Sequence, residues 1–543
     1  MRTSRQEYHA PMPHPTRSFW GWGYDDSQLG AEELSTVRAL VEARLGVPCP
    51  PPLAPPSLDA VRLPSPCLAP PPALAPIVSQ ARYDRAAHTY GKAYRDIVRG
   101  LDGDFAPAPD AVAYPRTEAE VIAVLAWCDE RGLSAIPYGG GSSTVGGVEA
   151  RRDEGRGAVS IDLGRLGQVL EIDHVSRAAR IQGGILGPAL EAALRPHGLS
   201  LRHYPQSFEL STLGGWIATR SGGHFATLHT HIEDFVEGLR VITPRGVVAT
   251  RRLPASGAGP SPDRLFAGSE GALGIVTEAW MRLHERPHFR AAATVRFRQF
   301  LEAAAAARAL GQSGLHPTNC RLLDAAEAQA NGAGDGTEHL LLVAFESADH
   351  PLEAWMDRAL ALCREHGGAH KEGVGRTRTG DEGERDGAAG AWRSMFLRAP
   401  YLRDGCCRLG LIAETFETAV TWDRFPAFHA SVMEATRAAT LRIAGAASVT
   451  CRLTHVYPDG AAPYFTVIAP GKPGSQVQMW DEIKAAAGEA ILAGGGTITH
   501  HHAVGRDHRP WYDRERPDLF AEMLRAAKRA VDPGAIMNPG VLV

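Results

Sequence analysis

Three consecutive histidines, His500, His501 and His502, form the densest group of side chains capable of chemistry in this sequence. Imidazole can bind zinc, and it can also transfer protons near neutral pH. In an extended chain successive side chains point to opposite faces, so only His500 and His502 would share a face. No nearby cysteine or glutamate completes a zinc-binding set. We therefore predict no metal here and assign the histidines to proton transfer.

A tyrosine, two arginines and a further histidine are isolated candidates. Tyr464 lies in an alternating apolar run, which by itself predicts a half-buried strand and a core tyrosine with a bonded hydroxyl. Arg321 and Arg403 would more often be surface or ion-paired residues than ligands, and His203 could pack against Tyr204. These residue types alone therefore leave a structural role open for each.

A glycine-rich loop is the first candidate for binding a ligand. Gly139 to Ser143 follows an apolar segment, Leu133 to Tyr138, that is predicted to be a buried strand after a helix capped at Thr117. Bare backbone N–H groups can converge on an anion such as a pyrophosphate. The P-loop lysine is missing, and no helix opens after the glycines as in a dinucleotide fingerprint. Both familiar nucleotide folds are disfavoured, and a tight surface turn is the alternative.

Two further segments also allow the backbone to approach a ligand closely. Pro205 to Trp216 and Gly268 to Glu278 are rich in small and hydroxyl residues, and the three segments span about 140 residues. In this order they resemble the FAD-binding domain of the vanillyl-alcohol oxidase and p-cresol methylhydroxylase superfamily, and the ending from Asp532 to Gly540 is similar to its usual close. The resemblance implies FAD, held non-covalently because serines occupy the positions where covalent members often carry a histidine. The implied cofactor-binding residues are Pro137, Tyr138, Gly139, Gly140, Gly141, Ser142, Ser143, Gln206, Ser207, Phe208, Glu209, Leu210, Ser211, Thr212, Thr219, Arg220, Ser221, Gly222, Glu270, Gly271, Ala272, Leu273, Gly274, Ile275 and Val276.

Motifs outside the flavin segments resemble the alkyldihydroxyacetonephosphate synthase family. They are FWGWG, RHYPQSFELST, CRLLD, APYLRD, E-x-F-E-T-x-x-x-W-D, CRLTHVYPDGAAPYF and ITHHHAVG, in that order along the chain. The resemblance implies that an acyl chain of acyl-dihydroxyacetone phosphate is exchanged for a fatty alcohol, without net redox change. A flavin dehydrogenase or oxidase of a 2-hydroxy acid or alcohol is the alternative. The implied catalytic residues are Tyr464, His500, His501, His502 and His203, and the implied substrate-binding residues are Arg403 and Arg321.

These residues receive specific roles from the resemblance. Tyr464 would take a proton from C1 of the substrate, with its pKa lowered by adjacent cationic histidines. His501 or His502 would shuttle protons, and His203 would orient the substrate. The chain departs from the family at His229-Thr230, where synthases commonly show Tyr-Gly before Ile-Glu-Asp. We expect this difference to bear on the substrate more than on the cofactor.

The predicted organisation is α+β with mixed sheets. We expect an N-terminal region (1–105) with a proline-rich arm (47–77), a two-subdomain FAD-binding domain (106–287), an α+β cap domain for the substrate (288–499), and a C-terminal segment (500–543) that returns to the FAD domain. Residues 366–390 are rich in glycine and charge and are predicted to form a surface loop.

Composition restricts the partners and the compartment. A net charge of −4 argues against nucleic acid, and eight scattered cysteines without C-x-x-C spacing are typical of reduced cytoplasmic thiols. The N-terminus lacks the apolar run of a signal peptide, and the C-terminus is not a peroxisomal S-K-L. We predict a bacterial cytoplasmic enzyme acting on a lipid-like substrate, with transient membrane contact and a homodimer as further options. The aromatic patch from Phe19 to Trp22 would contact the membrane or, as we favour, dock on the protein itself.

Overall fold

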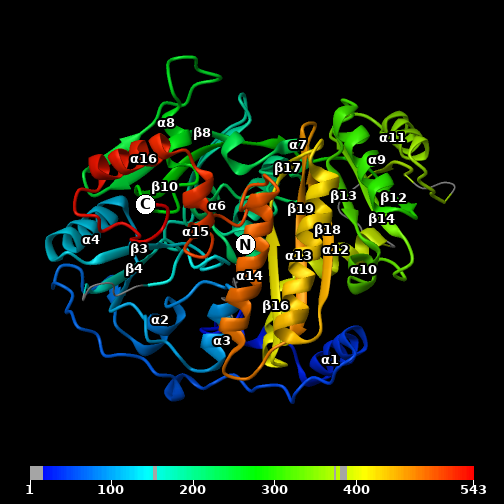
Figure 1. Cartoon of the computed structure of the whole chain (residues 1–543). Coiled ribbons are helices and arrows are strands. Elements are labelled where there is room, and N and C mark those ends of the chain that lie inside the picture. Colours follow the sequence, from blue (N-terminus) through cyan, green and yellow to red (C-terminus); the bar gives the residue numbers. More distant parts are fainter. Residues whose placement is uncertain (1–15, 151–155, 372–374, 380–387) are drawn as a thin grey trace, which may run out of the picture.

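A computed structural model describes residues 16–150, 156–371, 375–379 and 388–543. Three layers of structure are visible in Figure 1: two sheets of the N-terminal half with their helices, and a large sheet of the C-terminal half covered by long helices. The first two sheets carry the flavin segments predicted above, and the third forms the cap. The predicted α+β class with mixed sheets is confirmed.

The first sheet positions the glycine-rich loop. Its strand order is β1-β2-β4-β3, with β2, β4 and β3 parallel and β1 antiparallel; the strands are β1 (Val78–Ser79), β2 (Ala111–Ala113), β3 (Ser134–Tyr138) and β4 (Ala158–Asp162). Helix α4 (Glu118–Arg131) makes the crossover from β2 to β3. The Thr117 hydroxyl accepts the Glu120 N–H at its start, and Gly132 ends it with a φ of 62°. The glycines therefore leave the carboxyl end of β3, an edge strand that pairs with β4 along its whole length.

The second sheet is antiparallel and carries the other two flavin segments. Its order is β5-β6-β10-β8-β9, formed by β5 (Val169–Asp173), β6 (Ala178–Gln182), β8 (Val236–Thr243), β9 (Gly246–Ala249) and β10 (Ile275–Arg282). A small ladder of β7 (Leu199–Ser200) and β11 (His284–Glu285) adjoins it. The helices of this half are α5 (Gly187–Leu194), α6 (Leu213–Thr219), α7 (Ala226–His229) and α8 (Pro262–Phe266).

The cap is one antiparallel sheet in the order β15-β12-β14-β13-β18-β19-β16, with β17 paired to β19. Its strands are β12 (Phe289–Phe297), β13 (Asn319–Leu323), β14 (His339–Ser347), β15 (Arg378–Thr379), β16 (Leu411–Glu417), β17 (Val420–Thr421), β18 (Ser448–Val456) and β19 (Gly460–Pro470). Its helices are α9 (Phe300–Gln312), α10 (Ala325–Ala330), α11 (Glu353–Glu365), α12 (Ala388–Arg408), α13 (Phe425–Ala444) and α14 (Gln476–Ala493). In Figure 1 α13 and α14 lie side by side over β16, β18 and β19, and these helices make extensive contact with each other.

One predicted loop is wrong in its extent. Within the predicted loop 366–390, Arg378–Thr379 pair with β12, and α12 begins at Ala388, inside the predicted range. The remaining described residues of this stretch, 366–371 and 375–377, have no regular structure, whereas 372–374 and 380–387 lie outside the described residues. The cap sheet thus gains an edge strand where the glycine content had suggested only a loop.

The two ends of the chain pack on different halves: α1 and α3 of the N-terminal region contact the cap, whereas the C-terminal tail joins the flavin half. The N-terminal region contains α1 (Ala31–Leu45), α2 (Arg82–Ala87) and α3 (Tyr94–Leu101), and the proline-rich arm between α1 and α2 has only one 3-10 turn. Helices α15 (Arg509–Glu515) and α16 (Asp518–Val531) precede a tail in which Asn538 donates its backbone N–H to Ala135 of β3. No helix among the described residues has the length and apolar character needed to cross a bilayer.

Candidate functional site

A cavity of about 230 Å³ lies between the flavin half and the cap. Its wall combines the glycine-rich loop, the second flavin segment, four cap strands and α12. The predicted residues that line it are Gly139, Gly140, Gly141, Ser142, Ser143, Gln206, Ser207, Ser211, Thr212, Thr219, Ser221, Gly222, Arg321, Arg403, Tyr464, His501 and His502. The fold thus brings together residues that are more than 300 positions apart in the sequence.

The flavin side of this cavity offers donors for a phosphate-bearing planar group. Gly139 to Gly141 expose bare backbone, and eight hydroxyl side chains of serine and threonine follow on the same wall. Glycine is also required here for lack of space. A Cβ on Gly140 would lie 1.6 Å from the Leu210 carbonyl oxygen, and one on Gly139 would lie 2.3 Å from the Thr212 hydroxyl. The loop can therefore contact the second flavin segment only as glycine, and this donor set fits FAD.

Other predicted cofactor residues lie behind this wall. The third segment, Glu270 to Val276, does not line the cavity, and neither do Pro137, Tyr138, Phe208, Glu209, Leu210 and Arg220. Glu270 instead accepts the backbone N–H groups of Val504 (2.9 Å) and Gly505 (2.8 Å) and so anchors the segment after the histidines. Burial raises the pKa of its carboxyl to about 7. Direct contact of these residues with the cofactor stays a prediction.

A buried carboxylate shapes the histidine segment. Glu417, at the end of β16, accepts the backbone N–H groups of His500 (2.5 Å), His501 (3.1 Å) and His502 (2.7 Å), and also the Thr499 hydroxyl (2.7 Å). The side chain is fully buried, yet its pKa is held well below the usual range, because the three imidazoles and the Thr499 hydroxyl outweigh the effect of burial. Three consecutive N–H groups on one carboxylate require a bend, so the segment is not extended.

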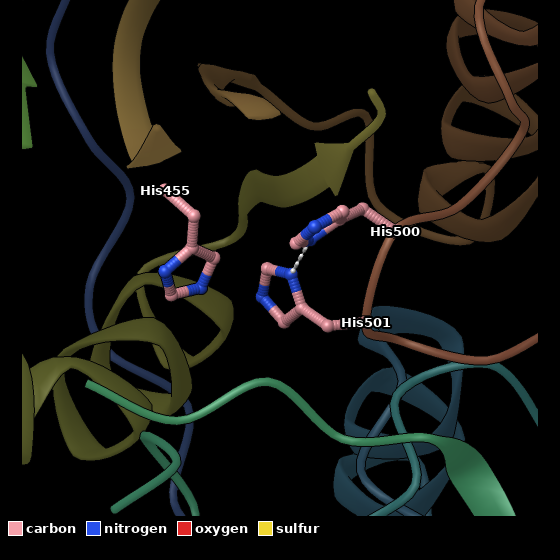
Figure 2. Close-up of side chains that lie close together, drawn as sticks. All are labelled: His455, His500 and His501. Carbon is pink, nitrogen blue, oxygen red and sulfur yellow. Dashed lines mark hydrogen bonds between the residues drawn. The ribbon is translucent and has the colours of Figure 1, made fainter. Parts of the chain in front are cut away.

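The bend overturns the argument from side-chain alternation. His500 and His501, expected on opposite faces, have their Nδ1 atoms 3.0 Å apart, and His455 of β18 joins them. Figure 2 shows these three rings turned toward one another. One nitrogen from each lies within 4.8 Å of the others, a spacing that could hold a metal ion. The expectation that His500 and His501 point to opposite faces is therefore wrong, whereas the absence of a metal stays a prediction.

These histidines are neutral. Burial lowers the pKa of His501 to about 3 and holds the pKa values of His455 and His500 well below the usual range. Neighbouring imidazoles add to the effect, whereas Glu417 opposes it at His500 and His501. Each neutral ring then offers one donor and one acceptor nitrogen.

The cation beside Tyr464 is an arginine and not a histidine. Burial raises the pKa of the Tyr464 phenol, while Arg452, whose guanidinium carbon lies 3.7 Å from the ring centroid, and a hydrogen bond with Thr415 lower it. Arg452 in turn donates to Glu327 at 2.6 Å. Because the histidines are uncharged, the expectation that they lower this pKa as cations is wrong. His501 stacks on the phenol ring with a centroid separation of 6.1 Å.

The two predicted substrate arginines both reach the cavity. Arg321, on β13, is 1% exposed; burial, together with Arg452, lowers its pKa to about 9, so it is still cationic at neutral pH. Arg403, on α12, donates to the Lys92 carbonyl at 2.6 Å and to Asp404 at 3.3 Å. With Arg452, three guanidinium groups surround one small space, which favours an anionic ligand.

His203 takes a different place from the one predicted. It is buried behind the cavity wall, its ring lies 5.0 Å from that of Trp216, and its Nε2 is 3.2 Å from the Ser221 hydroxyl. Burial lowers its pKa to about 3. His203 does not line the cavity itself, but its hydrogen-bond partner Ser221 does, and the role of His203 in orienting the substrate stays a prediction.

Several lining residues were not named individually as site residues, although Pro205, Gly215 and Trp216 lie within the second flavin segment. They are Trp22, Thr144, Val148, Pro205, Gly215, Trp216, Gly223, His224, Ala399, Pro400, Thr415, Arg452, Thr454 and His455. Trp22 belongs to the aromatic patch FWGWG and is buried, and its backbone N–H donates to the Asp404 carboxylate at 2.5 Å. The patch therefore docks on the protein itself, as favoured above. Arg452 and His455 are both buried on β18, and their place in the motif CRLTHVYPDGAAPYF was the one sequence signal for them.

Known proteins share both halves of this architecture. Residues 109–251 match the family model described as FAD binding domain, and residues 286–542 match FAD linked oxidases, C-terminal domain. The chain is 31% identical to alkyldihydroxyacetonephosphate synthase of Dictyostelium discoideum and 30% identical to that of Trypanosoma brucei brucei; these alignments cover 84% and 85% of this chain and 77% of each relative. It is 26% identical to D-lactate dehydrogenase [cytochrome] of Arabidopsis thaliana, over 80% of this chain and 73% of the relative.

A solved structure agrees with the sequence relatives. A crystal structure of alkyldihydroxyacetonephosphate synthase superposes with a TM-score of 0.79 at 25% identity, covering 96% of this chain and 98% of the other. The match therefore extends over most of both chains. Sequence identity of 30% or more over most of both chains, with an FAD-binding domain and one common fold, leads to a single conclusion: this chain is an FAD-binding member of the alkyldihydroxyacetonephosphate synthase family.

Proposed function

We propose that this protein exchanges the acyl chain of an acylated dihydroxyacetone phosphate for a fatty alcohol, with FAD bound and without net redox change. The observation that carries the proposal is the convergence of Tyr464, Arg452 and His501 with two further arginines on one cavity that also contains the glycine-rich loop. Bound FAD supplies an electrophilic centre for the reacting carbon of the substrate. The residues of the chain bind the substrate and move its protons.

The substrate head is a phosphate dianion. Arg403 lies on the α12 side of the cavity beside Trp22, and Arg321 lies on the cap strands, so guanidinium groups are available from two directions. Planar guanidinium groups pair with phosphate oxygens through two parallel hydrogen bonds, which fixes orientation as well as position. Arg403 is already held by the Lys92 carbonyl and Asp404, so it needs little reorganisation to bind an anion.

Tyr464 is the base for the proton on C1 of the substrate. Its ring lies under Arg452 and beside His501, so the phenolate that forms on ionisation is stabilised by a positive charge 3.7 Å from the ring centroid. Arg452 thereby takes the role that the sequence had suggested for the histidines. A neutral His501 or His502 can then accept the hydroxyl proton of the incoming alcohol.

A flavin dehydrogenase or oxidase of a 2-hydroxy acid or alcohol is the second candidate. Its support is the identity of 26% to D-lactate dehydrogenase [cytochrome] and to glycolate oxidase subunit GlcD of Bacillus subtilis. That identity is lower than the 31% and 30% found with the synthases, and it covers slightly less of this chain. The exchange reaction is therefore the stronger proposal.

A lipid substrate also has to be delivered from a membrane. We propose transient contact with a membrane surface in the cytoplasm, but through a surface other than the aromatic patch, because Trp20 and Trp22 are buried at 5% and 4% exposure. We also propose that the protein forms a homodimer.

Product analysis tests the exchange. Purified protein is incubated with palmitoyl-dihydroxyacetone phosphate and hexadecanol, and the expected products by mass spectrometry are hexadecyl-dihydroxyacetone phosphate and palmitate in equal amounts. The Tyr464→Phe variant should keep its yellow FAD spectrum and lose ether formation by at least about a hundredfold, the usual contribution of a general base. Full turnover by Tyr464→Phe would remove this residue from the mechanism.

A further inference from the structure

We propose that His501, His500 and Tyr457 form a proton relay from the active-site cavity to an open groove on the outside of the cap. Tyr457 thereby becomes a functional residue of the enzyme. The inference rests on the proposed function, because that reaction releases a proton inside the active-site cavity.

The proton balance of the exchange reaction shows why a path for protons is needed. The bond between C1 and the acyl oxygen breaks, and the acyl chain leaves with both electrons as a carboxylate. The alcohol oxygen forms a new bond to C1 and loses its hydrogen. A carboxylate is ionised at neutral pH, so each turnover releases one proton to solvent. This proton starts from a cavity that lies between the two halves of the molecule.

The inner part of the relay is continuous. His501 lines the cavity, and its Nδ1 lies 3.0 Å from Nδ1 of His500, the contact drawn as a dashed line in Figure 2. On the other side of the His500 ring, Nε2 lies 3.0 Å from the Tyr457 hydroxyl. Both ring nitrogens of His500 are therefore used, one toward the cavity and one away from it. His231 supports this arrangement, with its Nε2 3.1 Å from His500 Nε2 and 3.2 Å from the Tyr457 hydroxyl.

The outer part ends in a second, more open groove. This groove has a volume of about 630 Å³ and is lined by Tyr457 together with residues that include Arg424, Asp459, Thr497 and Glu515. It shares no lining residue with the active-site cavity among the described residues. Tyr457 is held in place because its carbonyl accepts the indole N–H of Trp422 at 2.9 Å. The tyrosine thus contacts the groove and the histidine chain at once.

The protonation states suit transfer in this direction. Burial keeps both histidines neutral, so each has one N–H and one lone pair, and burial raises the pKa of Tyr457, so its hydroxyl stays protonated. When His501 accepts a proton from the alcohol, its Nδ1 proton passes to His500. The Nε2 proton of His500 passes to the Tyr457 oxygen, and the hydroxyl proton leaves to water. One proton enters and one leaves, and no group keeps a charge.

The Tyr457→Phe variant tests the relay, because it removes one oxygen and keeps the ring. Ether formation and proton release, followed with a pH indicator, should both slow at least tenfold with little change in KM for either substrate. Turnover by the variant should become more sensitive to replacing H2O with D2O. In Tyr457→Ala, added imidazole should restore part of the rate, since a small buffer can enter through the groove. Tyr512→Phe, a half-buried tyrosine on α15, is the matched control and should be unaffected.

The outcomes separate the relay from the proposed function. If the unchanged protein forms no ether product, the proposed function fails. If the unchanged protein is active and Tyr457→Phe keeps its rate and its isotope effect, the relay alone is wrong. A slow Tyr457→Phe with an altered flavin spectrum, and a Tyr457→Ala that imidazole does not restore, would show a structural role and would also overturn the relay.

Discussion

Replacing Glu417 by glutamine tests how the histidine bend is held. Glutamine has the same shape, but its amide oxygen can replace only one carboxylate oxygen. The Oε1 position accepts from His501, His502 and the Thr499 hydroxyl, and the Oε2 position accepts from His500. If the amide oxygen takes the Oε1 position, the amide N–H₂ group faces the His500 N–H, donor against donor. Glu417→Gln therefore loses one bond completely and weakens three.

The size of this loss follows from the types of hydrogen bond. A hydrogen bond to a charged group contributes about 1.5–3 kcal/mol and a neutral one about 1 kcal/mol. One lost and three weakened bonds, offset by the lower cost of burying a neutral amide, give a decrease of about 3 kcal/mol in the free energy of unfolding. Urea unfolding at neutral pH, followed by flavin and tryptophan fluorescence, measures this decrease. Turnover should fall as well, because His501 loses its position against Tyr464.

Glu414→Gln is the matched control for Glu417→Gln. Glu414 is a buried carboxylate on the same strand, but it binds Lys484 and Trp480 and not the histidine bend. Its replacement should cost stability while leaving the chemistry at the histidines unchanged in folded protein. The reasoning is refuted if Glu417→Gln changes the free energy of unfolding by less than about 1 kcal/mol and keeps full turnover.

Two further predictions concern titration. Arg452→Lys keeps a charge for Glu327 but removes the planar guanidinium over Tyr464, so the pKa of the phenol should rise. The acid limb of the pH–rate profile should then move upward by about one pH unit. A profile that does not move would contradict this role of Arg452. Glu270 has a folded pKa of about 7 against 4.5 for an exposed carboxyl, so its contribution to stability is complete below pH 4.5 and is lost as pH rises toward 7. At 1.36 kcal/mol per unit the loss is about 3 kcal/mol. The free energy of unfolding, measured from pH 4.5 to pH 7, should fall with rising pH by this amount, and Glu270→Gln should remove this dependence on pH.

Local signals in the sequence were enough for many elements. The cap at Thr117 and the glycine at 132 mark both ends of α4. The cap helices α12, α13 and α14 were not predicted. Their apolar positions are interspersed with alanine, glycine and polar residues, and α12 contains Pro400, which normally argues against a helix interior. Their stability comes from packing on the cap sheet and not from local propensity.

In the candidate site, too, some residues could be predicted from local sequence patterns and others could not. The glycine-rich loop and Tyr464 lie on strand ends or strands that local patterns predict, and the structure places them in one cavity. The histidine bend was mispredicted because the acceptor that forms it, Glu417, lies 83 residues before His500 in the sequence. Likewise, pairing of β18 with β19 brings Arg452 opposite Tyr464. Long-range contacts of this kind leave no mark in the spacing of residues.

The central claim is that a flavin protein performs an exchange without net redox change. Anaerobic mixing of the yellow protein with palmitoyl-dihydroxyacetone phosphate and hexadecanol, followed by visible absorption and by product analysis of the same sample, tests it most directly. We predict that ether product and palmitate accumulate over many turnovers while the flavin ends oxidised. Bleaching of the flavin in step with loss of the substrate, without ether product, would contradict the claim and favour a dehydrogenase.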